Sequence, residues 1–505
     1  MKAKYRKKPM FRRKIRIRNP DRSYDAFLLD LNRVSPVQTG LGVHPLTQVE
    51  QNAMLRHYEM RIKTAFDEIK SVVEQFSTQM ASSGFANKIQ EIVKSKLGIT
   101  FNSETLSQFD QFCFDSDRFY CECVFAQFLT MSKEFFEEDP LKGQNRAKAE
   151  NMFRRAGFHA VGIAPCADGR LAHLISYVLR LPYSLVRRKA HAGALFDVSE
   201  SVRNWVFIEH SRFREGVPNS IDEPTQYLKI AVYHYSKSDP SHQGCAAHGS
   251  DDFKAAEAAL SKLNDFRQAI ENRFGCGSTV QTLLIGMNTD DDSLKMYVPD
   301  KEGKVCLNRF IETNALFHQT IKMTAEQARV QIKQAVMQCN VRSGSSLLLE
   351  SMNELIAWFI ENNFSQIEYV NQYENGCYFD IGHAERFIGI GSGFEEVQLR
   401  NLTYYGYLDT VEEGFNDVDV GIKIFTGLNI NNGLPIPIII RCDYDGRVPG
   451  SRERAEKKAK RIEGAVHNRY SNLSEKGKLQ TLCTLRDNTG YQPAERVVSL
   501  LSFGH

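Results

Sequence analysis

The chain has 505 residues, too many for one hydrophobic core, and at about 150 residues per domain this length predicts three or four domains. Hydrophobic residues make up 42% and charged residues 25%, as in globular proteins, and no run of about 18 apolar residues exists to span a bilayer. The N-terminus lacks the apolar centre of a secretory signal, so we expect the 11 cysteines in a reducing compartment without a disulfide framework.

The net charge of +3 hides a strongly basic N-terminal arm. Residues 1–22 carry +10, which leaves −7 on the other 483 residues. Such a segment cannot bury enough apolar surface to order itself, so we predict a disordered arm and linker over 1–45. Its charge suits nucleic acid, an anionic lipid surface or an acidic protein. Nucleic acid is the weakest of these, because no aromatic-interleaved RNA-binding motif accompanies the arm.

After the linker the pattern changes to apolar residues spaced three and four apart. This spacing begins in "LTQVEQNAMLRHYEM" and continues in "FANKIQEIVKSKL" and "SDRFYCECVFAQFL". It predicts a helical domain over 46–142.

From about residue 143 helices alternate with short apolar runs. "AVGIAP", "YLKIAVYH" and "TVQTLLIGMN" are typical of strands covered on both faces, and a long amphipathic helix separates the last two. The sequence therefore predicts an α/β domain with a largely parallel sheet over 143–384, with ligands near the carboxyl ends of its strands. A further α/β region covers 385–505, with "DVDVGIKIFTGL" and "LPIPIIIRCDYDG" as strands and "SRERAEKKAKRIEGAVHNRY" as a basic helix.

The end of the first of these strands carries a constellation of reactive residues. Cys166, Asp168 and Arg170 stand two residues apart, and in an extended segment such residues point the same way. This arrangement suits a thiolate metal ligand with a carboxylate beside it, held by a guanidinium group.

Further metal ligands must come from elsewhere in the chain. The dense supply is "YHYSKSDPSHQGCAAHGSD", which contains His234, His242, Cys245 and His248. Two thiolates and an imidazole favour zinc, and three protein ligands leave a fourth tetrahedral position open, as in catalytic sites.

These residues resemble the β-class carbonic anhydrases, in which a C-x-D-x-R motif is followed by a strand-ending His and a second Cys. More closely, "FHAVGIAPCADGRL", "YLKIAVYH", "DPSHQGCAAHGS", "GHAERFIG" and "VPGSRER" look like the carboxysomal shell subclass of that family. The resemblance implies a helical N-terminal domain, a catalytic domain and a C-terminal domain that is a degenerate second copy of the β-class fold without its own metal.

The resemblance also implies the chemistry of the site. Cys166, His234 and Cys245 would hold one Zn²⁺ per chain, and hydroxide on the zinc would convert carbon dioxide to bicarbonate. Asp168 would orient that hydroxide, and Arg170 would keep Asp168 ionised and away from the metal. The ordinary β-class spacing H-x-x-C is met by His242 and Cys245, so His242 is the alternative ligand. We favour His234, because it closes a strand.

A near-copy of the motif stands in the C-terminal half. In "RCDYDGRVPG" one extra residue separates Cys442 from Asp445 and Arg447, which points these two away from the cysteine. We therefore expect one zinc per chain.

The resemblance implies a place in the carboxysome, where the enzyme would supply carbon dioxide to Rubisco. It also implies a homodimer or larger assembly, and the basic arm would bind Rubisco, shell or scaffold proteins. A competing hypothesis is a zinc-stabilised scaffold protein with little activity, its site closed by Asp168 or His242 as a fourth ligand.

Overall fold

The computed structural model describes most of the chain between residues 42 and 497. Outside the described residues lie 1–41, 77–84, 112–114, 139–145, 183–184, 217–225, 276–278, 301–303, 340–346, 380–382, 392–393, 409–414, 491 and 498–505. The prediction of a disordered arm therefore falls almost entirely outside them. In the described segments, no helix is long and apolar enough to cross a membrane.

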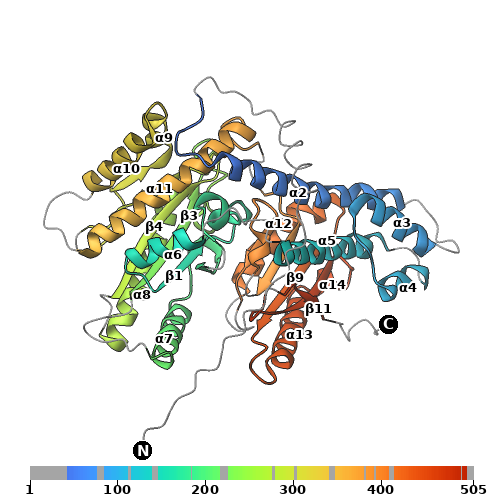
Figure 1. Ribbon diagram of the computed structural model, residues 1–505. Coiled ribbons are helices and arrows are strands. Elements are labelled where there is room, and N and C mark those ends of the chain that lie inside the picture. Colours follow the sequence, from blue (N-terminus) through green and yellow to red (C-terminus); the bar gives the residue numbers. More distant parts are fainter. Residues whose placement is uncertain are drawn as a thin grey trace, which may run out of the picture.

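The region before the first sheet is helical, as predicted. Its helices are α2 (Val49–Phe76), α3 (Phe85–Leu97), α4 (Ser103–Gln111) and α5 (Ser116–Glu138). The three-and-four spacing of α2 buries one stripe of side chains: Leu55, Tyr58, Ile62, Phe66 and Ile69. Figure 1 shows α2 extending over both halves of the molecule, where it contacts α5 and α11 (Leu347–Tyr373).

The first sheet contains six strands, and its first four are parallel. Their order is β2 (Arg187–Arg188), β1 (Ala160–Pro165), β3 (Tyr227–Tyr235), β4 (Val280–Asn288), β5 (Leu294–Tyr297) and β6 (Phe310–Glu312). The strands β5 and β6 join antiparallel at the edge. Every residue of β3 is buried, which explains its near-continuous apolar sequence and confirms the predicted largely parallel sheet.

Helices pack around this sheet. The long predicted helix is α8 (Asp252–Phe274), and it contacts both β3 and β4. The other helices of this half are α6 (Arg146–Arg155), α7 (Val198–Arg214), α9 (Thr313–Thr320), α10 (Ala325–Cys339) and α11.

The second sheet repeats the connectivity of the first. Its order is β8 (Thr403–Gly406), β7 (Phe387–Gly391), β9 (Ile436–Tyr444), β10 (Leu479–Asp487) and β11 (Glu495–Arg496). The pairs β8–β7, β7–β9 and β9–β10 are parallel and β10–β11 is antiparallel, which matches β2–β1–β3–β4–β5 strand for strand. The helix α12 (Asn416–Leu428) precedes β9 as α7 precedes β3, and α13 (Ser451–Arg469) follows β9 as α8 follows β3; the short α14 (Ser471–Ser474) comes next. This confirms the expected second copy of the α/β fold.

One predicted strand is wrong. "DVDVGIKIFTGL" alternates apolar and polar residues at its start, but it forms the helix α12. The helix buries Val418, Ile422 and Phe425, which lie four and three residues apart. Gly421 lies where a Cβ would come within 2.8 Å of the Tyr404 ring, so the glycine lets the helix approach β8 closely.

Candidate metal centre

The centre lies at the carboxyl ends of two neighbouring parallel strands. Cys166 follows the last residue of β1, and its amide donates to the carbonyl oxygen of Val232 in β3 at 3.0 Å. His234 is the last but one residue of β3. Parallel strands end at the same edge of a sheet, so the topology places the thiol and the imidazole side by side, where the sequence predicts a ligand.

Cys245 reaches the same point on the loop that follows β3. The loop is held at its base by Asp290, whose carboxylate accepts from Ser236 Oγ and from the amides of Lys237 and Ser238, each at 2.8 Å. At Gly244 an added Cβ would lie 2.8 Å from the backbone of Ser250, so the close return of the loop requires glycine. The role of Asp290 cannot be predicted from the sequence, because Asp290 follows β4 and its partners follow β3.

The three predicted ligands converge. The ligand atoms of Cys166, His234 and Cys245 all lie within 4.8 Å of one another, and the two sulfur atoms are 3.9 Å apart. All three residues are buried, and the imidazole Nδ1 of His234 has no hydrogen-bond partner. Two thiols and an imidazole form a soft donor set that fits a zinc ion.

The alternative histidine lies elsewhere. The side chain of His242 is 77% exposed and its Nδ1 contacts Asp239 Oδ1 at 2.9 Å. His248 is not part of this group of ligand atoms, and its Nε2 lies 3.3 Å from the carbonyl oxygen of Gly193. The structure thus brings His234, and not His242, to the two cysteines.

Asp168 and Arg170 form a buried two-point ion pair beside these ligands. Nε and Nη2 of Arg170 donate to Oδ1 and Oδ2 of Asp168 at 2.9 and 2.8 Å, and Asp168 Oδ2 lies 3.3 Å from His234 Nε2. Burial by itself would raise the pKa of Asp168, but the positive charge of Arg170 and the electrostatic interaction with His234 outweigh burial and hold that pKa well below its usual range.

The route to this pairing differs from the predicted one. The chain is not extended through Arg170, because residues Gly169–Leu171 form a turn of 3-10 helix, η1, with Asp168 as its N-cap. The Asp168 carboxylate accepts from the Arg170 amide at 2.9 Å as well as from its guanidinium group. The turn, rather than strand alternation, brings the two side chains together.

The pKa values of the two cysteine thiols shift in opposite directions. The hydrogen bond between Cys166 and Cys245, and to a lesser extent burial, raise the pKa of Cys166 well above the ordinary value. The same hydrogen bond lowers the pKa of Cys245. The amide of Gly193 also donates to Cys166 Sγ at 3.3 Å, which favours a thiolate there. A bound cation would favour the ionised form of both.

A second group of potential ligands adjoins the centre. Asp168, His383 and Glu385 offer donor atoms within 4.8 Å of one another. Glu385 Oε1 accepts from the Gly169 amide at 3.2 Å and lies 3.2 Å from His383 Nδ1. Sequence reasoning missed Glu385: it lies just before β7, and only the packing of the two halves brings it to η1.

The second sheet holds charges where the first holds the ligands. Arg441 pairs in register with Gly391, at the end of the strand β7 that corresponds to β1. Its fully buried guanidinium group contacts Glu396, Glu395 at 3.0 Å and Asp443 at 2.8 Å. Over the described ranges, neither group of metal donors includes a residue of this sheet's strands.

The near-copy of the motif lies on the wrong strand. Cys442 is buried in β9, which corresponds to β3 rather than β1, and Asp445 and Arg447 form an exposed ion pair beyond its end. Cys442 is therefore separated from Asp445 and Arg447, as expected from the extra residue between the cysteine and the aspartate.

Three family models match the chain. They describe the N-terminal, catalytic and C-terminal domains of "Carboxysome Shell Carbonic Anhydrase" and match residues 44–136, 148–383 and 384–501.

Curated relatives match over nearly the whole length. A carboxysome shell carbonic anhydrase of Hydrogenovibrio crunogenus is 62% identical over 463 residues, which cover 91% of this chain and 87% of the relative. Proteins of the same name from Prochlorococcus marinus strain MIT 9313 and Halothiobacillus neapolitanus are 45% and 43% identical, and the matched segments cover 90% or more of this chain.

Proposed function

The chain belongs to the carboxysome shell carbonic anhydrases, and on this basis we propose that it interconverts carbon dioxide and bicarbonate at a zinc ion held by Cys166, His234 and Cys245. It is a lyase, as its relatives are. The observation that carries the assignment of the site is the convergence of two buried thiols and an imidazole beside the Asp168–Arg170 pair.

Each residue of the site has a distinct task. Zinc, when bound, lowers the pKa of water to about 7, the value known for carbonic anhydrases with three histidine ligands, and so supplies hydroxide at neutral pH. Asp168 would accept a hydrogen bond from the hydroxide that such a zinc ion supplies and so orient it toward carbon dioxide. Arg170 keeps Asp168 ionised and uses both carboxylate oxygens, so that Asp168 does not act as a further ligand.

This arrangement supports an open catalytic site over a closed structural one. A scaffold protein with a four-ligand site needs Asp168 or His242 as the fourth donor. Asp168 is engaged by Arg170, and His242 is exposed and paired with Asp239.

The enzyme is a carboxysome protein, and we propose that it supplies carbon dioxide to Rubisco there. The basic arm, 1–45, would bind Rubisco or a shell or scaffold protein by charge, so that the interaction weakens as salt rises. Removal of residues 1–20 should leave hydration activity intact and reduce encapsulation; unchanged packaging would argue against this role.

The proposed domain boundaries follow the two sheets. We propose a helical domain over 46–142, the catalytic zinc domain over 143–384 and a metal-free domain over 385–505. The two tandem α/β halves take the place of the paired copies of a β-class dimer, and we propose that the whole chain forms a homodimer or a larger assembly.

Metal analysis of the purified chain tests the site. We expect one zinc per chain, lost in Cys166→Ser and in His234→Ala. Cys442→Ser and His242→Ala are matched controls, because one removes a buried cysteine from the corresponding sheet and the other removes the alternative histidine. Two zinc ions per chain, or loss of zinc in His242→Ala with retention in His234→Ala, would overturn the assignment.

A further inference from the structure

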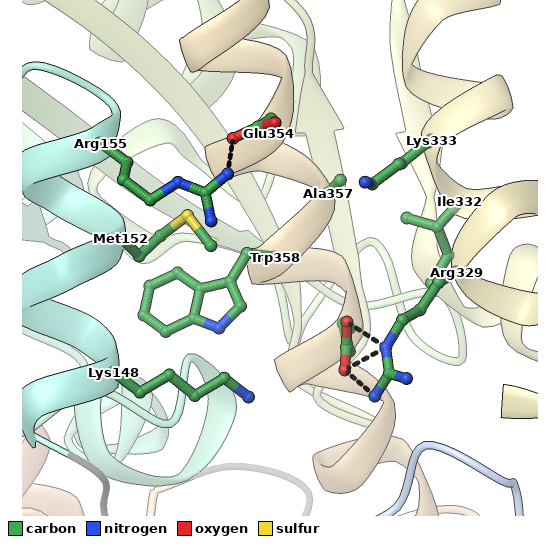
Figure 2. A pocket seen from close by; sticks show the side chains of 10 residues that line it. Lys148, Met152, Arg155, Arg329, Ile332, Lys333, Glu354, Ala357 and Trp358 are labelled. Carbon is green, nitrogen blue, oxygen red and sulfur yellow. Dashed lines mark hydrogen bonds and ion pairs between the residues drawn. The ribbon is translucent and has the colours of Figure 1, made fainter. Parts of the chain in front are cut away.

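The C-terminal half of the chain reaches the metal centre through two carboxylates. Figure 2 shows the cavity between α6, α10 and α11, whose lining residues all belong to the half that carries the centre. At the centre itself, by contrast, Glu385 accepts from the Gly169 amide at 3.2 Å and Asp417 accepts from the Ala192 amide at 2.9 Å. Both carboxylates come from the half that we propose to be metal-free.

The segment that Asp417 contacts runs beside Cys166. It consists of His191 and the short 3-10 helix η4 (Ala192–Ala194). His191 pairs with Cys166 in a parallel bridge: the His191 amide donates to the carbonyl oxygen of Pro165 at 3.1 Å, and the Ala167 amide donates to that of His191 at 3.0 Å. The start of η4 is therefore fixed to the strand end that carries the cysteine.

Asp417 holds this start from the other side. It lies in the first turn of α12, and its side chain is 16% exposed. One carboxylate oxygen, Oδ1, accepts from the Ala192 amide, and the other, Oδ2, lies 3.4 Å from Nδ1 of His191. Two contacts from one carboxylate restrict both the backbone and the side chain at the beginning of η4.

The next amide along η4 donates to a proposed ligand. The Gly193 N–H donates to Cys166 Sγ at 3.3 Å, and the Gly193 carbonyl oxygen lies 3.3 Å from Nε2 of His248 in η5 (Ala246–His248), the turn after Cys245. Gly193 has a φ of 67°, and an added Cβ would lie 2.6 Å from His248 Nε2, so the position requires glycine. Gly193 thus links the segments of both cysteines.

We propose that Asp417 is a positioning residue for the metal centre, which fixes η4 so that the Gly193 N–H donates to the sulfur of Cys166. The inference rests on the proposed function, in which Cys166 is a zinc ligand. A hydrogen bond to a thiolate stabilises the ionised sulfur and withdraws negative charge from it. The metal-free half therefore acts on the centre through a carboxylate that touches no proposed ligand itself.

Three substitutions on α12 test this role. Asp417→Ala removes both contacts, whereas Asp417→Asn keeps an oxygen that can accept from the Ala192 amide. Asp419→Ala is the matched control, because Asp419 lies in the same first turn but pairs with Arg469 at 2.6 Å near the surface. Circular dichroism checks that each variant is folded. If Asp417→Ala does not fold, Asp417→Ser replaces it, because the serine oxygen lies one bond closer to the backbone than the carboxylate oxygens.

Two measurements report on the metal-loaded chain. Competition with a chelator should show that Asp417→Ala binds zinc at least about tenfold more weakly, the usual effect of removing a group that supports a ligand. In the chain loaded with Co²⁺, Asp417→Ala should shift the sulfur-to-cobalt charge-transfer band to longer wavelength, because a sulfur that has lost a hydrogen bond gives up electrons more easily. Asp417→Asn should change both readouts less, and Asp419→Ala should match the parent.

A third measurement needs no metal. Hydrogen exchange at the Gly193 amide, followed by mass spectrometry, reports whether its bond to Cys166 stays closed. Asp417→Ala should speed this exchange at least about tenfold, as expected when a hydrogen bond to a charged group no longer holds the segment. Asp419→Ala should leave it unchanged.

Several results would overturn the inference. They are parent values of zinc affinity, cobalt band and exchange rate in the folded Asp417→Ala variant, equal changes in Asp417→Asn and Asp417→Ala, or equal changes in Asp419→Ala. A parent chain that binds no zinc contradicts the proposed function instead, and the exchange rate alone then decides whether Asp417 holds η4 against Cys166.

Discussion

Asp168 and Arg170 make the same two-point contact as Asp445 and Arg447, but the first pair is buried and the second is exposed. The nitrogen–oxygen distances are 2.9 and 2.8 Å in the first pair and 2.9 and 2.7 Å in the second. The side chain of Arg170 is 3% exposed and that of Arg447 is 79% exposed. Since ion pairs in water contribute little, the chain contains its own control for the buried pair.

Arg170→Lys should lower kcat/KM while zinc stays bound. A lysine cannot make the two parallel contacts of a guanidinium group, so Asp168 is released from its fixed orientation beside His234. We expect a loss of about 10- to 100-fold in stopped-flow hydration assays, the usual effect of removing a group that supports a metal site. Arg447→Lys should have full activity. Equal activity of the two variants would contradict the role given to Arg170.

Glu385→Gln should lower the pKa of His383. Burial lowers that pKa, but the hydrogen bond with Glu385 and the charges of Asp168 and Glu385 outweigh burial, so the pKa lies above the ordinary value. Removing one of the two negative charges should lower it by about 1 unit or more, measured by NMR titration of labelled histidine. Asp417→Asn, which changes a carboxylate beside His191, should leave His383 unaffected. A rise in the pKa of His383 would contradict the predicted sign.

Lys229→Met should stabilise the protein, more strongly at neutral and lower pH than in alkali. Lys229 is 3% exposed in β3, with Ser201 Oγ at 3.2 Å and the Phe196 ring at 4.2 Å, and burial lowers its pKa from 10.5 to about 7. The Lys229 amine binds its proton more tightly in the unfolded chain than in the folded chain. Unfolding between pH 7 and 10.5 therefore takes up a proton, so the contribution of Lys229 to the free energy of unfolding rises with pH in this window.

Denaturant unfolding at several pH values measures this effect. Over that window the free energy of unfolding should rise with pH more steeply in the parent chain than in Lys229→Met, by up to about 1.4 kcal/mol per pH unit. Lys322→Met, at an exposed position, should follow the parent. Parallel curves for the parent and Lys229→Met would mean that the buried lysine keeps its ordinary pKa.

Arg441→Met should destabilise the chain strongly. It leaves the carboxylates of Glu395, Glu396 and Asp443 without the guanidinium group that they share, and an uncompensated buried charge costs about 3–5 kcal/mol. Arg447→Met, at the surface of the same sheet, should change the free energy of unfolding by less than about 0.5 kcal/mol. Similar values for both variants would show that the buried cluster is not needed for stability.

The comparison of the two sheets shows where sequence patterns succeed and fail. Strands such as β3 are buried on both faces, so their apolar runs predict them directly. The helix α12 begins with alternating Asp and Val residues, a pattern that wrongly predicts a strand. The segment is helical because one face of the helix packs against β8 and β9. The near-copy around Cys442 resembles the metal motif in its letters, yet the strand order makes it the counterpart of a different strand.

By itself, the sequence determined the α/β class, the buried strands such as β3, the family resemblance and the two cysteines proposed as ligands, because burial and ligand chemistry restrict residue types locally. The sequence favoured His234 over His242 but left both open, and only the tertiary structure shows that His234 lies beside both cysteines, because the end of β3 brings it to Cys166. It also revealed Glu385, which the packing of the two halves brings to η1. Such sites combine residues that are distant in the chain, and their proximity depends on how helices and sheets pack together.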